Sequence, residues 1–79
     1  MSRSIREIFQ EIALSLWMQP ASFKELMERK FLSDKSSLAV SNMLESMVAT
    51  GWIYESKGMY HTHADTMTKH ITGSLKLAE

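Results

Sequence analysis

The chain has 79 residues, of which 44% are hydrophobic and 23% charged, and this composition is typical of one small globular domain. It contains no cysteine, so disulfides, thiolate metal sites and cysteine nucleophiles are excluded. Nine basic residues balance nine acidic ones, so the basic excess usual in nucleic-acid-binding proteins is absent, and any DNA binding must come from locally placed charges or from a dimer that doubles them.

The first residues of the chain run directly into a periodic segment with acidic side chains, which is not typical of a signal peptide. The apolar stretches are also much shorter than a membrane span. We therefore expect a cytoplasmic protein without a membrane partner.

A stripe of apolar residues predicts a first helix from about Ser4 to Trp17. Ser2 or Ser4 can cap its start, and Pro20 ends it because proline cannot continue a helix. The stripe has helical spacing and consists of Ile5, Ile8, Phe9, Ile12, Ala13 and Leu16.

Two further helices are predicted from caps and spacing. Ser22, followed three residues later by Glu25, forms a capping box for a short helix from about Phe23 to Lys30. The third helix is expected from about Asp34 to Thr50, with Ser33 or Asp34 as its cap and Gly51 directly after its last turn. Its apolar face consists of Leu38, Val40, Met43, Leu44, Met47 and Val48.

A β-hairpin is expected after Gly51. Aromatic and β-branched residues predict strands at Trp52–Glu55 and Met59–His63. The loop Ser56-Lys57-Gly58 suits a type I turn followed by a glycine bulge.

The last segment is expected to be a tail, residues 64–79, attached to a domain of residues 1–63. In this tail, Met67 and Ile71 suit a short helix capped by Asp65 and stopped at Gly73.

The segment from residue 33 to residue 60 resembles the recognition helix and wing of the winged helix-turn-helix superfamily, in particular small bacterial or phage-type transcriptional regulators. In that family an apolar-patterned helix ends in a leucine-like residue, three further residues, a glycine and an aliphatic strand. These positions are held here by Met47, Val48-Ala49-Thr50, Gly51 and Trp52-Ile53. Phe23 to Arg29 is similar to the family's second helix, so the resemblance covers about residues 5–63.

The resemblance implies an α+β, mostly helical fold of three helices followed by a two-stranded hairpin wing. It also implies a DNA-binding transcriptional regulator, with residues 34–50 in the major groove and the hairpin of residues 52–63 as the wing. The outward face of the third helix would then contact base edges, because a helix fits the major groove and its N-terminal half reaches the bases. The expected base contacts are Ser36, Ser37, Ser41, Asn42 and Glu45, and the expected phosphate contacts are Ser22, Lys24, Lys35 and Lys57.

An alternative function is open at this point, namely a winged-helix adaptor or antirepressor that binds protein and no DNA. The zero net charge favours it, and so does the possible exposed patch at Trp52. Either function is compatible with a homodimer formed through the first helix or the tail, or with a separate protein partner.

Trp52 is a candidate interface residue, together with Met67 and Ile71. If Ile53 faces the core, strand alternation turns Trp52 outward, whereas a tail that folds back would cover it.

His61 and His63 lie on one face of the second strand, and His70 follows in the tail. Without supporting carboxylates or thiolates they are interpreted as surface groups, and no metal site or cofactor is expected. The chain contains no phosphate-binding glycine loop, HExxH helix or GxSxG elbow, so neither an enzyme nor a small-molecule substrate is expected.

Overall fold

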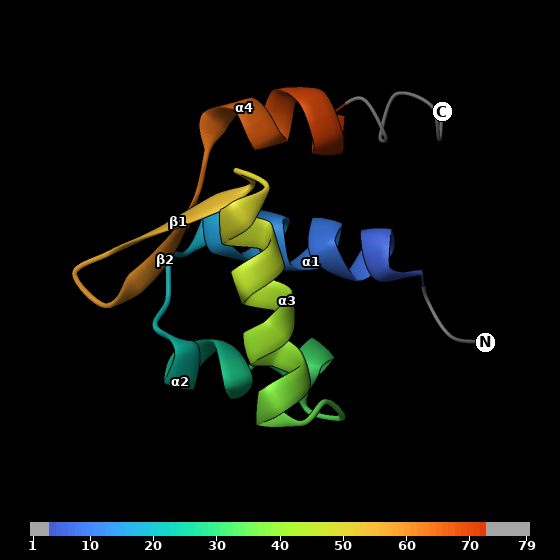
Figure 1. The fold of residues 1–79 in the computed structure, drawn as a ribbon, viewed down its shortest axis with the longest axis vertical. Coiled ribbons are helices and arrows are strands. Elements are labelled where there is room, and N and C mark those ends of the chain that lie inside the picture. Colours follow the sequence, from blue (N-terminus) through green and yellow to red (C-terminus); the bar gives the residue numbers. More distant parts are fainter. Residues whose placement is uncertain (1–3, 73–79) are drawn as a thin grey trace.

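The computed structural model describes the backbone of residues 4–72 and the side chains of residues 4–69 (Figure 1). The elements in chain order are α1 (Ile5–Met18), α2 (Phe23–Met27), the 3-10 turn η1 (Lys30–Leu32), α3 (Ser37–Ala49), β1 (Ile53–Ser56), β2 (Met59–Thr62), α4 (Ala64–Thr66) and the π-helical turn η2 (Met67–Thr72). The fold is thus a mostly helical α+β domain with one antiparallel hairpin, as the sequence predicts. In Figure 1, α1 and α3 cross at the centre, and the hairpin projects beyond the helices.

Capping boxes begin both N-terminal helices, which confirms the predicted capping box at Ser22 and the predicted cap at Ser4. The Ser4 hydroxyl accepts a hydrogen bond from the Glu7 backbone N–H at 3.2 Å, and the Glu7 carboxylate accepts one from the Ser4 backbone N–H. Ser22 and Glu25 repeat this arrangement at the start of α2. The alternative cap, Ser2, lies outside the described residues.

Two of the predicted helix boundaries are wrong. The second helix ends at Met27 and is followed by η1, so it is shorter than expected. The third helix begins at Ser37, because the Lys35 N–H bonds the Leu32 carbonyl in a turn and leaves Ser36 to cap the helix. The Ser36 hydroxyl accepts from the Ala39 N–H at 3.1 Å.

Gly51 ends α3 in the predicted position. Its φ of 82° is left-handed, and its N–H donates to the Val48 carbonyl at 3.1 Å. The Trp52 N–H donates to the Met47 carbonyl at 2.9 Å, which completes a Schellman motif. This motif turns the chain directly from α3 into β1.

The hairpin closes with two loop residues, so the predicted three-residue loop with a bulge is wrong. Lys57 and Gly58 have φ values of 54° and 79°, and Ser56 pairs with Met59. Two consecutive positive φ values define a type I′ turn, whose twist matches that of the strands. The register therefore places Glu55 opposite Tyr60.

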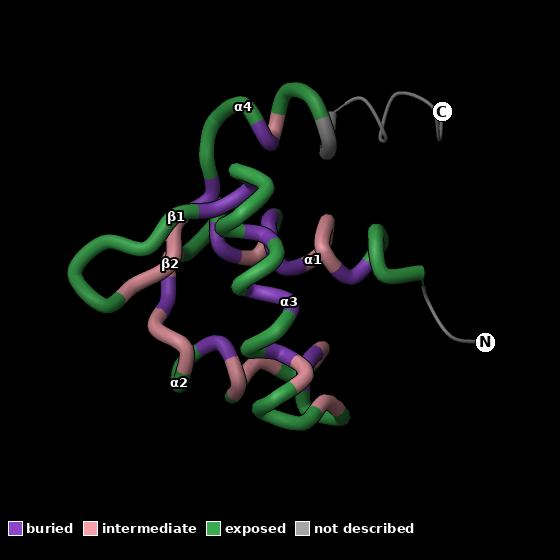
Figure 2. Tube along the Cα trace, in the orientation of Figure 1, coloured by how far each residue is buried: buried purple, intermediate pink, exposed green. Residues whose placement is uncertain are grey.

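The core lies where α1, α3 and the base of the hairpin meet, and it continues under α2 and η1 (Figure 2). Its buried apolar members are Ile8, Ile12, Ala13, Leu16, Ala21, Leu26, Leu32, Val40, Met43, Leu44, Met47, Trp52 and Ile53. Leu38 and Val48 were expected among them, but they are 70% and 42% exposed. On the α3 wheel, Leu38 lies opposite Val40, Met43 and Met47, whereas Val48 lies at the edge of the core face next to Leu44.

Trp52 is buried, so the prediction that it faces outward is wrong and the covered alternative holds. Its ring meets the Phe9 ring edge-on, with centroids 6.0 Å apart. Its carbonyl accepts from the Thr66 hydroxyl at 2.7 Å, and Met67 packs against the same core. The N-cap of α4 is His63, so the predicted Asp65 cap is wrong, and Gly73 lies outside the described residues.

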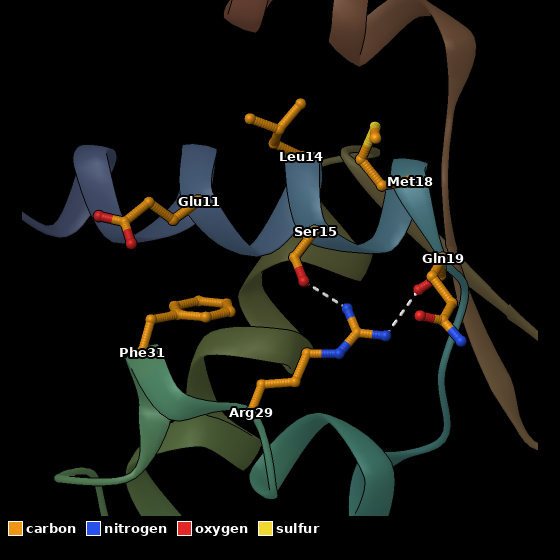
Figure 3. A pocket seen from close by; sticks show the side chains of 7 residues that line it. All are labelled: Glu11, Leu14, Ser15, Met18, Gln19, Arg29 and Phe31. Atoms are coloured by element: carbon orange, nitrogen blue, oxygen red, sulfur yellow. Dashed lines mark hydrogen bonds between the residues drawn. The ribbon is translucent and has the colours of Figure 1, made fainter.

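Arg29 joins the end of α2 to α1 (Figure 3). Its guanidinium donates to the Ser15 hydroxyl and, at 2.8 Å, to the Gln19 carbonyl. Arg29 therefore stabilises the end of α1 and the turn that follows it.

Among the described helices, none has both the length and the apolar character needed to cross a membrane.

Candidate interaction surface

Helix α3 presents one uncovered face to solvent. Ser37, Leu38, Ser41, Asn42 and Glu45 are all exposed, because the core residues of α3 occupy the opposite side of the helix. Glu45 is the single charged residue in the α3 sequence SLAVSNMLESMVA. The face that was expected to contact bases is thus uncovered, and it carries no positive charge.

A groove of about 380 Å³ separates the second half of α3 from the hairpin. It is lined by Ser41, Leu44, Glu45, Val48, Ala49, Glu55 and Tyr60. Glu55 and Tyr60 reach it from the strands because they face each other across the hairpin, on the same side as the buried pair Ile53 and Thr62. We call this surface the α3–hairpin groove.

The α3–hairpin groove has a negative potential. Partial burial, and then the charges of Glu55 and Glu45, raise the pKa of the Tyr60 phenol above its ordinary value. Because Coulomb energy falls with distance, both carboxylates must lie near this phenol. The last turn of α3 contains no basic residue, so the negative end of the helix dipole adds to the same potential.

The residues expected to contact phosphate lie on separate segments, and two of them already have partners. The Ser22 hydroxyl is part of the α2 capping box, and Lys35 pairs with Asp34 at 3.7 Å. Lys24 lies exposed on α2, and Lys57 lies exposed at the hairpin tip. The hydroxyl of Ser36, one of the expected base contacts, caps α3.

Of the remaining candidate interface residues, the two whose side chains the structure describes contribute little exposed surface. Trp52 is buried and Met67 is half-buried against the core, whereas the side chain of Ile71 lies outside the described residues.

His61 on β2 and His63, which follows the end of this strand and was predicted to belong to it, flank Tyr54 on the outer face of the hairpin. The Tyr54 ring stacks on His61 with centroids 5.1 Å apart and lies tilted against His63 at 4.6 Å. Within the described side chains, no group of three histidines or carboxylates is arranged to hold a metal ion. The side chain of His70 is not among those described.

A second, larger groove of about 500 Å³ runs along the outer side of α1 (Figure 3). Leu14 and Met18, which are 41% and 77% exposed, line it together with Phe31 and the Arg29 side chain. It lies on the first helix, which was expected, as an alternative to the tail, to form a homodimer.

Sequence reasoning identified Ser41 and Glu45 in the α3–hairpin groove but missed Glu55 and Tyr60. The signal was present in Lys57-Gly58, since glycine in a two-residue loop favours a type I′ turn and fixes Glu55 opposite Tyr60. Leu38 and Val48 were missed because their spacing was assigned to the core face.

Comparisons of the chain with protein-family models, with curated proteins and with solved structures give no match.

Proposed function

We propose that this chain is a winged-helix protein-interaction module, in which α3 takes the place of the recognition helix and the hairpin that of the wing. The order of helices and strands supports this, as does the Schellman turn that carries α3 directly into β1. The bound partner would lie in the α3–hairpin groove and along the exposed face of α3.

The observation that carries the proposal is the charge of the surface that would meet DNA. Glu45 and Glu55 line its groove from two elements, and α3 has no lysine or arginine. Duplex DNA carries one negative charge for about every 1.7 Å of its axis. A carboxylate about 4 Å from a phosphate costs about 1 kcal/mol in bulk water and about 4 kcal/mol at an effective dielectric constant of about 20.

Exposed apolar side chains on the same helix add to this argument. Leu38 is 70% exposed on the uncovered face of α3, and Val48, which is 42% exposed, lines the α3–hairpin groove. Fully burying such a side chain contributes about 1.5–3 kcal/mol. A protein partner that buries these side chains gains this free energy. Unlike a phosphate backbone, it need not be repelled by Glu45 and Glu55.

A second candidate is the DNA-binding regulator, and Asn42 favours it. Asn42 is exposed in the first half of α3, between Ser41 and the core residue Met43, and an asparagine there can pair with adenine through two hydrogen bonds. For this function Asn42→Ala should relax sequence specificity, whereas Lys57→Ala should weaken binding to all sequences equally.

A photo-crosslinking residue at Ser41 separates the two candidates in cells that express the full chain. The protein-interaction function predicts an adduct with a protein that survives nuclease treatment. It also predicts no such adduct when the same residue replaces Asp65, an exposed position on α4. A nucleic-acid adduct at Ser41, or equal protein adducts at both positions, would contradict the proposal.

A further inference from the structure

The chemistry of the α3–hairpin groove restricts what it can bind. Neither Glu45 nor Glu55 has a hydrogen bond or ion pair within the described part of the chain. The lining contains no lysine, arginine or histidine. Two unpaired carboxylates on opposite walls therefore face the same space.

The floor of the groove is apolar. Leu44 is 1% exposed at its base, and Val48 and Ala49 form one stripe with Ser41 and Glu45 because their spacing is helical. Tyr60 adds a half-buried aromatic ring from β2. An occupant must therefore present apolar groups to the floor and charged groups to the walls.

We propose that the α3–hairpin groove binds an amphipathic segment of a partner protein that carries arginine next to apolar side chains. The inference rests on the proposed function and names the chemistry of the partner. Charge complementarity with Glu45 and Glu55 requires a cation, and the apolar floor excludes a purely polar chain.

Arginine fits this site better than lysine. Its planar guanidinium binds a carboxylate through two parallel hydrogen bonds and stacks on an aromatic ring, and it loses its hydration more easily than an ammonium group. The groove offers both kinds of contact, since Glu55 and Tyr60 are paired residues on neighbouring strands.

A phage-displayed library of random dodecapeptides, selected against the immobilised full chain, tests the inference without knowledge of the partner. We expect arginine to be enriched over the unselected library, and to be enriched more strongly than lysine. A synthesised winning peptide should shift the NMR amide signals of Ser41, Ala49, Glu55 and Tyr60 in the labelled protein.

Two variants test whether peptide binding depends on the carboxylates of Glu45 and Glu55. The double variant Glu45→Gln with Glu55→Gln should weaken binding of that peptide at least tenfold, whereas Glu28→Gln, an exposed glutamate after α2, should change it less than twofold. The amide spectrum of each variant reports whether it is folded.

Two outcomes would overturn the inference in distinguishable ways. Winning peptides that map to the groove without arginine, or that bind the double variant equally well, would remove the arginine partner and leave the proposed function in place. Winning peptides that all map away from the groove would remove both.

Discussion

The Thr66 hydroxyl provides a direct test of how residues 64–69 support the hairpin. Thr66 is 2% exposed, and its hydroxyl donates to the Trp52 carbonyl at 2.7 Å. Trp52 immediately precedes β1, the strand that carries Glu55. The substitution Thr66→Val keeps the shape of the side chain and removes the donor.

The expected loss of stability is about 1 kcal/mol. A neutral hydrogen bond contributes about 0.5–1.5 kcal/mol net, whereas a buried carbonyl left without a partner costs about 1–3 kcal/mol. The Trp52 carbonyl also accepts from the His63 N–H at 3.1 Å, so it keeps one partner in the variant. The smaller of the two costs therefore applies.

Urea unfolding followed by circular dichroism measures the effect. With a denaturant slope of about 1 kcal/mol per molar, the midpoint should fall by about 1 M. The matched control is Thr68→Val, because Thr68 is exposed and its hydroxyl bonds only the Ala64 carbonyl four residues earlier, at 3.4 Å. Equal midpoints for the two variants would refute the packing of this segment on Trp52.

Three further predictions concern the cap of α2, the turn of the hairpin and the exposed face of α3. Ser22→Ala should cost about 1 kcal/mol in urea unfolding at pH 7. Hydrogen bonds from the Ser22 backbone and then from its side chain lower the pKa of Glu25 below 4.5, so stability from this cap is present above pH 4.5 and is lost as the pH falls through the lower folded-state pKa. The variant keeps the backbone donor, so the wild-type midpoint should fall only slightly more steeply there than that of the variant. Lys57→Asn should raise stability by about 0.5 kcal/mol, because asparagine accepts the left-handed φ of 54° more readily than lysine, and an unchanged or lower midpoint would contradict the type I′ turn. Leu38→Ser should change stability by less than about 0.5 kcal/mol, and a larger loss would mean that Leu38 is packed.

Features set by neighbouring residues could be predicted from the sequence. The capping boxes at Ser4 and Ser22 depend on residues three positions apart, and the end of α3 at Gly51 depends on one glycine. The start of α3 could not be predicted, because Ser33, Asp34 and Ser36 are all good caps and the choice depends on the turn after η1.

Features set by distant contacts could not be predicted from the sequence. Trp52 is buried because Phe9 on α1 and Thr66 on α4 both reach it, and neither is near it in the chain. Lys57-Gly58 signals that Glu55 lies opposite Tyr60, but the α3–hairpin groove depends in the same way on the distant packing of β1 against α3. Helical periodicity predicts that Ser41 and Glu45 are exposed on α3. It does not predict that Glu55 and Tyr60 line the other side of the groove.

An NMR titration of the labelled full chain with random-sequence duplex DNA at low salt tests the central claim most directly. The account predicts that the amide signals of Ser37, Ser41 and Asn42 stay in place, because Glu45 and Glu55 repel the phosphate backbone from this face. Salt-dependent shifts confined to these residues and to the hairpin tip at Lys57 would contradict it and would establish DNA as the ligand of this surface.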